Sequence, residues 1–128
     1  MDPLADMLTV IRNASRAGLP SASFPFSNFK SAVADKLKRT GYLRSVTNKG
    51  KKVKKTIEVE LLYGNGGPKI KELRRLSKPS CRVYRPIKAI HSVRQGYGSA
   101  FYSTSSGILT DKEAREAKIG GELLFRIW

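Results

Sequence analysis

The sequence is poor in the residues that build most catalytic and metal sites. Its 128 residues include one histidine, His91, and one cysteine, Cys81. Neither has a second histidine or cysteine with which to assemble a catalytic triad or a metal cage. We therefore predict no enzyme activity and no cofactor. A lone cysteine also excludes an internal disulfide, which is typical of an intracellular protein.

Long hydrophobic runs are absent too. No stretch approaches the roughly 18 apolar residues of a membrane-spanning helix, and the chain opens on Met1-Asp2-Pro3 rather than on a basic and then hydrophobic leader. We expect neither a membrane span nor a secretory signal, and no small-molecule substrate.

Acidic residues are scarce relative to basic ones. Ten Asp and Glu stand against 25 Lys and Arg, which leaves a formal net charge of +15. A charge of this density indicates a polyanionic partner. Because 40% of the residues are apolar, the chain can still bury a core, and a disordered basic tail is a poor description of it.

The hydrophobic pattern predicts an α+β fold. In the first half, helices are expected over residues 3–16 and 28–40, an edge strand over 21–26, and a hairpin from strands 42–47 and 56–63. In the second helix we expect Phe29, Val33 and Leu37 to be buried and Lys30 to point outward.

A glycine-rich break at residues 64–68 divides the chain. We predict an N-terminal α/β domain over 1–64 and a mostly antiparallel β domain over 65–128. The second half should contain strands 70–76, 81–85 and 123–128, with a turn at 77–80 between the first two. A helical turn is expected at 89–94, and the capping-box spacing of Thr110 and Glu113 predicts a short helix.

Most of the cations fall in two windows of the sequence. Residues 30–55 and 69–94 hold 19 of the 25 Lys and Arg, interleaved with Tyr42, Tyr84 and His91, which can stack on bases. The lysine-rich loop 49–55 is either a solvated tip or part of a nucleic-acid contact. This distribution favours nucleic-acid binding.

A run of short hydroxyl residues, Ser103-Thr104-Ser105-Ser106-Gly107, follows the second window. A tight turn explains it without any function. Alternatively, small hydroxyls and the backbone N–H groups of a turn can approach phosphates, ribose 2′-hydroxyls and base edges more closely than lysine can. Both interpretations stay open from the residues alone.

Several blocks of the sequence resemble one known family. They are Asp2 to Leu8, Ile11 to Ala14, Leu76 to Pro79, Arg82 to Tyr84, Gly96 to Gly98, Ser103 to Asp111, Glu113 to Arg115 and Gly120 to Glu122. In this order and spacing they resemble ribosomal protein number eight of the bacterial-type small subunit.

The resemblance implies a structural ribosomal protein that binds the central domain of 16S-type rRNA directly as a primary assembly protein and supports translation. It also implies neighbouring small-subunit ribosomal proteins as partners, and a ribosome in the cytoplasm, a plastid or the mitochondrial matrix. The RNA-binding residues it implies are Ser103, Thr104, Ser105, Ser106, Gly121, Glu122, Tyr84, Arg82, Lys78, Lys30, Asp2 and Pro3.

Two other functions fit the charge. A general DNA-coating or architectural protein would carry the same cations, but it has no need of a hydroxyl-rich turn. An enzyme acting on RNA would need an acid–base pair or metal-binding carboxylates, and the ten acids are dispersed along the chain.

Overall fold

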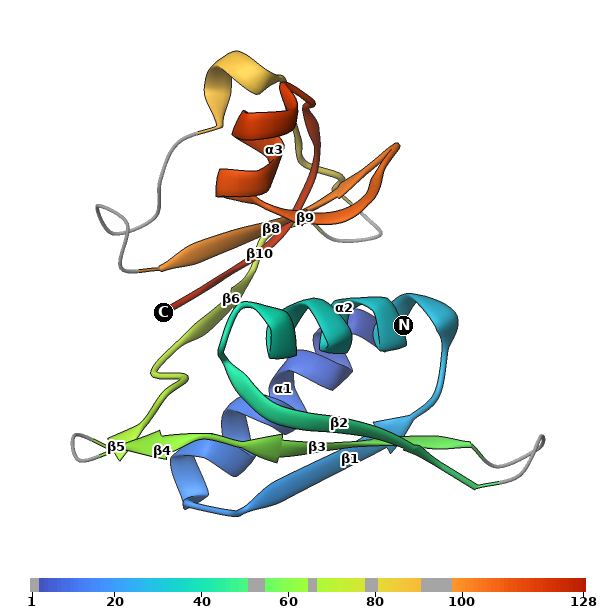
Figure 1. Cartoon of the computed structure of the whole chain (residues 1–128), viewed down its shortest axis with the longest axis vertical. Helices are drawn as coiled ribbons and strands as arrows, with labels where there is room; N and C mark the ends of the chain where they lie inside the picture. The colour runs from blue at the N-terminus through green and yellow to red at the C-terminus, as the bar shows by residue number, and fades with distance from the viewer. Residues whose placement is uncertain (1–2, 51–54, 65–66, 78–80, 91–97) are drawn as a thin grey trace. The chain divides into compact units, whose positions relative to one another are not determined.

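The computed structural model describes residues 3–50, 55–64, 67–77, 81–90 and 98–128 (Figure 1). Two compact units make up the fold, Pro3–Lys71 and Glu72–Trp128. The division between them lies a few residues beyond the glycine-rich segment 64–68, where the sequence predicts the domain boundary. The architecture is α+β, as predicted.

The first unit combines two helices with a small antiparallel sheet. Its elements are α1 (Pro3–Ala17), β1 (Ser21–Pro25), α2 (Asn28–Arg39), β2 (Leu43–Lys49), β3 (Thr56–Leu61), β4 (Tyr63–Gly64) and β5 (Gly67–Pro68). The main sheet has the order β1-β3-β2, so β1 is at an edge and β2 and β3 form the predicted hairpin. β4 and β5 pair separately.

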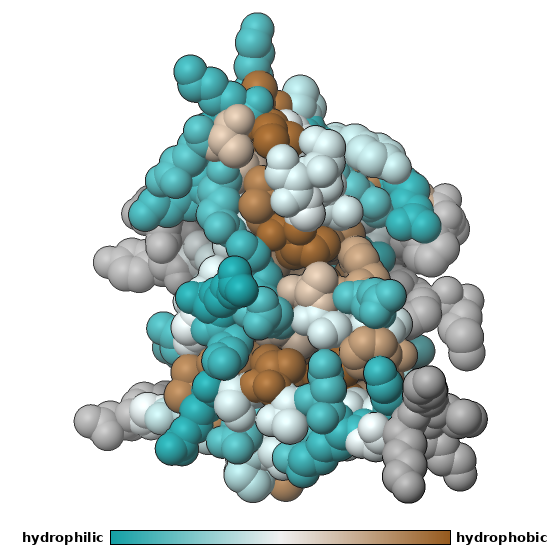
Figure 2. Space-filling view, turned by 45° about the vertical axis from the view of Figure 1, so that its right-hand side comes forward, coloured by the Kyte–Doolittle hydropathy of each residue, from teal (hydrophilic) through white to brown (hydrophobic). Residues whose placement is uncertain are grey.

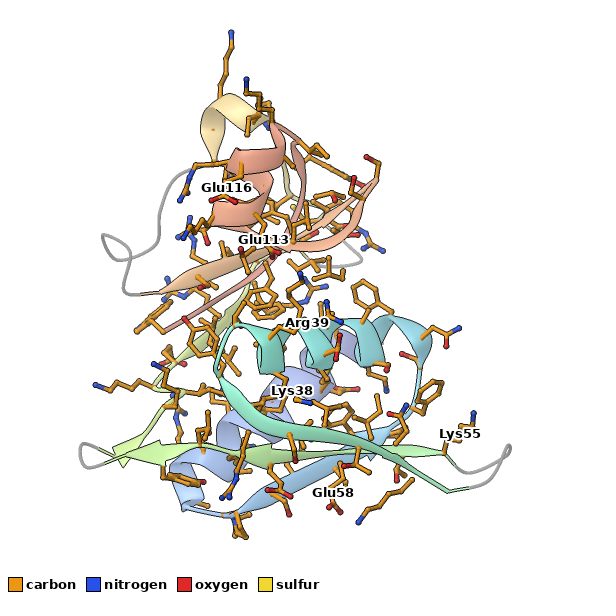
Figure 3. The ribbon with its side chains drawn as sticks, in the orientation of Figure 1. Lys38, Arg39, Lys55, Glu58, Glu113 and Glu116 are labelled. Atoms are coloured by element: carbon orange, nitrogen blue, oxygen red, sulfur yellow. The ribbon has the colours of Figure 1, made fainter. Side chains whose placement is uncertain are left out.

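One face of this sheet is covered by α1 and α2 (Figure 1). Ile57, Val59 and Leu61 of β3 are buried, whereas Glu58 points away from the helices (Figure 3). This alternation is what a strand with a single buried face requires. The helices contribute the residues Leu4, Met7, Leu8, Ile11, Val33 and Leu37 to the core.

The expected orientation of α2 is wrong at its first turn. Lys30 is only 7% exposed, whereas Phe29 is 41% exposed. The buried stripe runs through positions 30, 33, 34 and 37, which is the i, i+3, i+4, i+7 spacing of one helical face. Position 29 is one residue, about 100° of rotation, from that face. The aliphatic stem of a lysine can lie along apolar surface.

The described residues of the second unit form an antiparallel sheet with one α-helix and a 3₁₀-helix. Its elements are β6 (Leu73–Arg75), β7 (Tyr84–Arg85), η1 (Ile87–Ala89), β8 (Ser99–Thr104), β9 (Gly107–Thr110), α3 (Asp111–Ala117) and β10 (Gly121–Ile127). The order is β6-β10-β8-β9, with β7 also paired to β10. The predicted capping box is present, since Thr110 and Glu113 exchange side-chain hydrogen bonds with each other's backbone N–H.

Strand pairing in this unit differs from the sequence prediction. The predicted strands 70–76 and 81–85 are shorter, and each pairs with β10. Of the turn predicted between them at 77–80, residues 78–80 lie outside the described part. The strands β8 and β9 were not predicted at all. In β8 three consecutive residues, Ala100, Phe101 and Tyr102, are buried, so polar and apolar residues do not alternate as in a half-buried strand. Of the helical turn expected at 89–94, residues 91–94 lie outside the described part.

The sheet has two distinct faces. On one face, here called the α3 face, Ala100, Tyr102 and Leu123 pack with Ala114 of α3. On the second face, the rings of Phe101 and Phe125 stack with centroids 4.8 Å apart. Because side chains alternate along a strand, Ser103 shares the second face with Phe101.

Candidate nucleic-acid interface

The hydroxyl-rich run forms the turn of the β8–β9 hairpin. Thr104 pairs with Gly107, and Ser105 and Ser106 make the connection. The Thr104 hydroxyl accepts a hydrogen bond from Ser106 N at 3.1 Å and donates one to Gly107 O at 2.8 Å. Gly107 has φ +100°, a conformation that favours glycine. The turn is therefore closed by its own threonine.

This geometry gives the four hydroxyl residues different roles. Ser105 and Ser106 are exposed at the tip, and Ser103 and Thr104 are half-buried at its base. Because the Thr104 hydroxyl proton is directed to Gly107 O, Thr104 acts first on the shape of the turn. Ser105 and Ser106 are the residues of the run exposed at the tip.

A row of three residues crosses the second face beside this turn. Glu122 of β10 lies between Ser103 of β8 and Tyr84 of β7 in the strand register. Directly opposed residues of an antiparallel pair share a face, with Cβ atoms about 5 Å apart. Tyr84 is 64% exposed. The row thus places a hydroxyl, a carboxylate and an exposed aromatic ring next to one another.

The Glu122 carboxylate is held by residues far away in sequence. Its Oε2 accepts hydrogen bonds from the Ser77 hydroxyl and from Arg82 Nη1, the latter at 3.0 Å. Ser77 is fully buried, and its hydroxyl also accepts a bond from Val83 N at 3.1 Å. Burial acts to raise the pKa of Glu122, but the bonds from Ser77 and Arg82 and the charges of Arg82 and Arg75 outweigh it and lower the pKa.

Two glycines let the strands approach closely at this row. A Cβ on Gly121 would lie 2.5 Å from Ser103 O, and one on Gly120 would lie 2.6 Å from Arg85 O. Contacts this short with backbone atoms require the strands to shift. The spacing of β7, β10 and β8 around Glu122 therefore depends on both glycines.

The family model described as Ribosomal protein S8 matches residues 2–128. The chain belongs to this family. Proteins of the family are structural and non-enzymatic, and so is this chain. It is a ribosomal protein, as the resemblance implied, and its bacterial relatives are cytoplasmic.

Three relatives illustrate the extent of the similarity, each named small ribosomal subunit protein uS8. The protein of Mycoplasmopsis pulmonis is 45% identical over 127 residues, which cover 99% of this chain and 96% of the relative. That of Bifidobacterium adolescentis is 46% identical over 128 residues, covering 99% and 97%. That of Hyphomonas neptunium is 43% identical over 127 residues, covering 99% and 97%.

The structure brings most of the predicted site residues of this S8 family member together on the second unit. Ser103 to Ser106, Gly121, Glu122, Tyr84 and Arg82 lie at or beside the row and the turn. The others do not join them. Pro3 begins α1 and Lys30 is a largely buried residue of α2, both in the first unit. Asp2 and Lys78 lie outside the described residues.

Sequence reasoning missed Ser77 as part of the site. It occurs in a block that carries the family resemblance, but its role depends on Glu122, which is 45 residues away. The residues around Ser77 give no indication in the sequence that its hydroxyl binds a glutamate so far along the chain. The sequence also did not predict that Arg82 and Glu122 bind each other.

Several exposed cations of the first unit are already paired. Asp35 binds Arg39 at 3.1 Å, Glu58 binds Lys49 at 3.1 Å, and Glu60 lies 3.9 Å from Arg44. Figure 3 labels Arg39 on α2 and Glu58 on β3. Lys55 lies over the ring of Phe26 at 5.2 Å. Hydrophilic residues cover much of the face in Figure 2.

Two surface hollows in the first unit contain these same carboxylates. Asp35 lines one of about 380 Å³, and Glu58 and Glu60 line another of about 410 Å³. Each of these acids has a basic partner. The described residues contain no group of three or more His, Cys, Asp or Glu able to hold a metal ion. Within the same residues, no helix is both long and apolar enough to cross a lipid bilayer.

Proposed function

We propose that this chain is a structural component of the small ribosomal subunit that binds small-subunit rRNA directly. The observation that carries the proposal is the exposed pair Ser105 and Ser106 at the tip of a turn that the Thr104 hydroxyl closes. The name of the curated relatives, small ribosomal subunit protein, supports the assignment to this subunit. The resemblance to the family further implies the central domain of the rRNA as the binding site, primary assembly as the role, and neighbouring ribosomal proteins as partners.

In this proposal the row and the turn provide specificity for the RNA, and the cations provide affinity. Uncharged hydroxyls and backbone groups fix register against sugars and base edges, and the exposed ring of Tyr84 offers a surface on which a base can stack. The excess of positive charge supplies sequence-independent affinity for phosphates. Glu122 would keep the row in shape, because its carboxylate ties Ser77 and Arg82 together.

Ser105→Ala tests this function directly. The variant should lose about 1–3 kcal/mol of binding free energy for a central-domain rRNA fragment, by analogy with the loss of one specifying contact. Its stability should be unchanged, because Ser105 is exposed. Ser23→Ala, at an exposed serine of β1 in the first unit, is the matched control. Equal affinities of the two variants would contradict the proposal.

Competition with other polyanions tests the alternative of a general nucleic-acid coat. At matched salt concentration, wild-type protein should prefer the rRNA fragment to duplex DNA and to a random RNA. If these bind equally tightly, charge alone accounts for binding, and the proposed function is wrong.

A further inference from the structure

Two arginines lie directly opposite each other on neighbouring strands of the second unit. In the register of β6 and β10, Arg74 pairs with Arg126. On the other side of Arg126 the register places Ala100 of β8, which has only a methyl side chain. Opposed residues of an antiparallel pair share a face. Both guanidinium groups therefore start from the α3 face, which Ala100 shares.

Neither arginine is neutralised within the part of the chain that the structure describes. Both side chains are exposed, and among the described residues neither has a hydrogen-bond or ion-pair partner. This contrasts with Arg39, Arg44 and Arg82, each of which has an acid within 4 Å. Like charges directly opposite each other destabilise a sheet. An anion placed between them would turn this repulsion into two attractions.

The acids around the pair are engaged elsewhere. Asp111 lies next to Ala100, where its Oδ1 accepts from Ala100 N at 3.2 Å and its Oδ2 accepts from Arg115 at 3.1 Å. Glu72, two residues before Arg74, accepts from Leu73 N through Oε1 at 3.1 Å. Asp111 is paired with Arg115, and Glu72 can offset only one of the two positive charges of Arg74 and Arg126, so the local charge stays positive.

Tyr102 gives an independent indication of charge on the same face. Burial and the nearby Asp111 carboxylate raise the pKa of its hydroxyl, and the charges of Arg126, Arg85 and Arg115 act in the opposite direction. Arg126 is therefore close enough to act on Tyr102 and belongs to a wider group of cations on the α3 face.

We propose that Arg74 and Arg126 together bind one phosphate of the RNA sugar-phosphate backbone, as a second RNA contact of this chain. Guanidinium groups suit this role because their donors form a planar fork that matches two phosphate oxygens. The proposal rests on the proposed function, and it adds a contact on the face of the sheet opposite to the Glu122 row.

The position of the pair fits one continuous RNA ligand. β6 and β7 both pair with β10, so Arg74 and Tyr84 approach the same strand at successive points along it. Because of the bulge between Leu123 and Phe125, the partners of Glu122 and Arg126 on β8 are only three positions apart, which corresponds to about 10 Å along the strand. Both β6 and β7 lie on the side of β10 away from β8. An RNA that contacts Tyr84 on the second face therefore reaches the arginine pair on the α3 face by passing around this edge of the sheet.

The test compares Arg74→Gln, Arg126→Gln and the double variant in binding to a central-domain rRNA fragment over a range of salt concentrations. The double variant should bind roughly tenfold more weakly at physiological salt, and the slope of log K against log salt should fall in magnitude by about one unit, as expected for the loss of one phosphate contact. Since both arginines bind the same phosphate, the fold-loss of affinity in the double variant should be smaller than the product of the fold-losses in the two single variants. Arg44→Gln removes a cation that is paired with Glu60 and is the control, with less than a twofold change expected.

Thermal unfolding of the free proteins provides the second readout. Each single variant should be at least as stable as wild type, because the substitution removes a repulsion, so weaker RNA binding would not come from misfolding. Unchanged affinity and salt slope in the double variant, alongside a loss in Ser105→Ala, would overturn the arginine site and leave the proposed function standing. Normal RNA binding combined with poor incorporation into reconstituted subunits would also overturn it, in favour of an acidic protein partner. Failure of wild type itself to prefer rRNA would remove the basis of both.

Discussion

Glu122 is a largely buried acid in a protein with a strong excess of positive charge. Its side chain is 14% exposed, and it binds Arg82, which is 51% exposed. The fully buried hydroxyl of Ser77 supplies a second hydrogen bond. Breaking such a partly buried network leaves donors without acceptors, and that cost is larger than for an exposed ion pair. Glu122 therefore contributes to stability as well as to the surface of the site.

Glu122→Gln should show this contribution through its dependence on pH. The pKa of Glu122 is lowered in the folded protein, so its stabilising effect is complete above the ordinary glutamic-acid pKa of about 4.3 and is lost as the pH falls through the lowered folded pKa. We expect the variant to lose about 1–3 kcal/mol of unfolding free energy at pH 7. The gap to wild type should narrow near pH 3.

Urea unfolding at the two pH values measures this difference. Glu58→Gln is the control, because Glu58 is 35% exposed and pairs with a more exposed Lys49; it should cost less than about 1 kcal/mol. A loss in Glu122→Gln that is as large at pH 3 as at pH 7 would show that the charge of Glu122 is not what stabilises the network.

Single residues mark the limit of what the sequence could predict. The family resemblance identified both Glu122 and Arg82, but as RNA contacts rather than as partners of each other. Lys30 was expected to point outward because the buried stripe of α2 was assigned to Phe29, Val33 and Leu37, yet the stripe begins at Lys30. Such outcomes depend on helix rotation and on contacts that are distant in sequence.

At the scale of elements, local patterns were sufficient where one face of an element is buried. The helices α1 and α2, the edge strand β1 and the β2–β3 hairpin all follow from spacing, caps and alternation. The pattern did not predict β8, because this central strand has only a short apolar run among small polar residues. Both of its pairing partners follow it in the sequence, β9 directly and β10 only after α3. Long-range pairing of this kind leaves little trace in a local pattern.

The β8–β9 turn gives a prediction at this scale. Thr104→Val removes the hydroxyl that links Ser106 N to Gly107 O, and valine, which is β-branched like threonine, keeps the strand preference. We expect a loss of about 1 kcal/mol in unfolding free energy, because the two hydrogen bonds of the Thr104 hydroxyl are lost at a partly exposed site. Binding to rRNA should also be weaker, because the turn is less well ordered. Ser105→Ala should weaken binding without this loss of stability.

Hydrogen exchange of the Ser106 amide and urea unfolding would measure the effect. Faster exchange in Thr104→Val, with unchanged exchange in Ser105→Ala, is the expected pair of results. If Thr104→Val is as stable as wild type and binds rRNA equally well, the threonine does not organise the turn.

At the scale of the whole molecule, the net charge and the neutral groups of the site should have different effects on RNA binding. The net charge of +15 is visible from composition, and it predicts a polyanion without identifying one. In the first unit some cations are neutralised by local acids, among them Arg39 and Lys49. Salt dependence should therefore reflect fewer cations than the composition suggests, and selectivity should reflect the neutral groups around Ser105.

The lysine-rich loop tests this separation. Residues 51–54 of this loop lie outside the described part of the chain. Lys51→Ala combined with Lys52→Ala removes two positive charges from the segment 49–55 and changes no residue of the turn or of the Glu122 row. If both lysines meet phosphates, the salt slope of rRNA binding should fall by about two units. The preference for the rRNA fragment over random RNA should stay the same, because both ligands lose the same electrostatic contribution. Ser105→Ala should do the reverse, lowering the preference at an unchanged slope, and a double-lysine variant that loses preference along with slope would show that this loop helps to select the RNA.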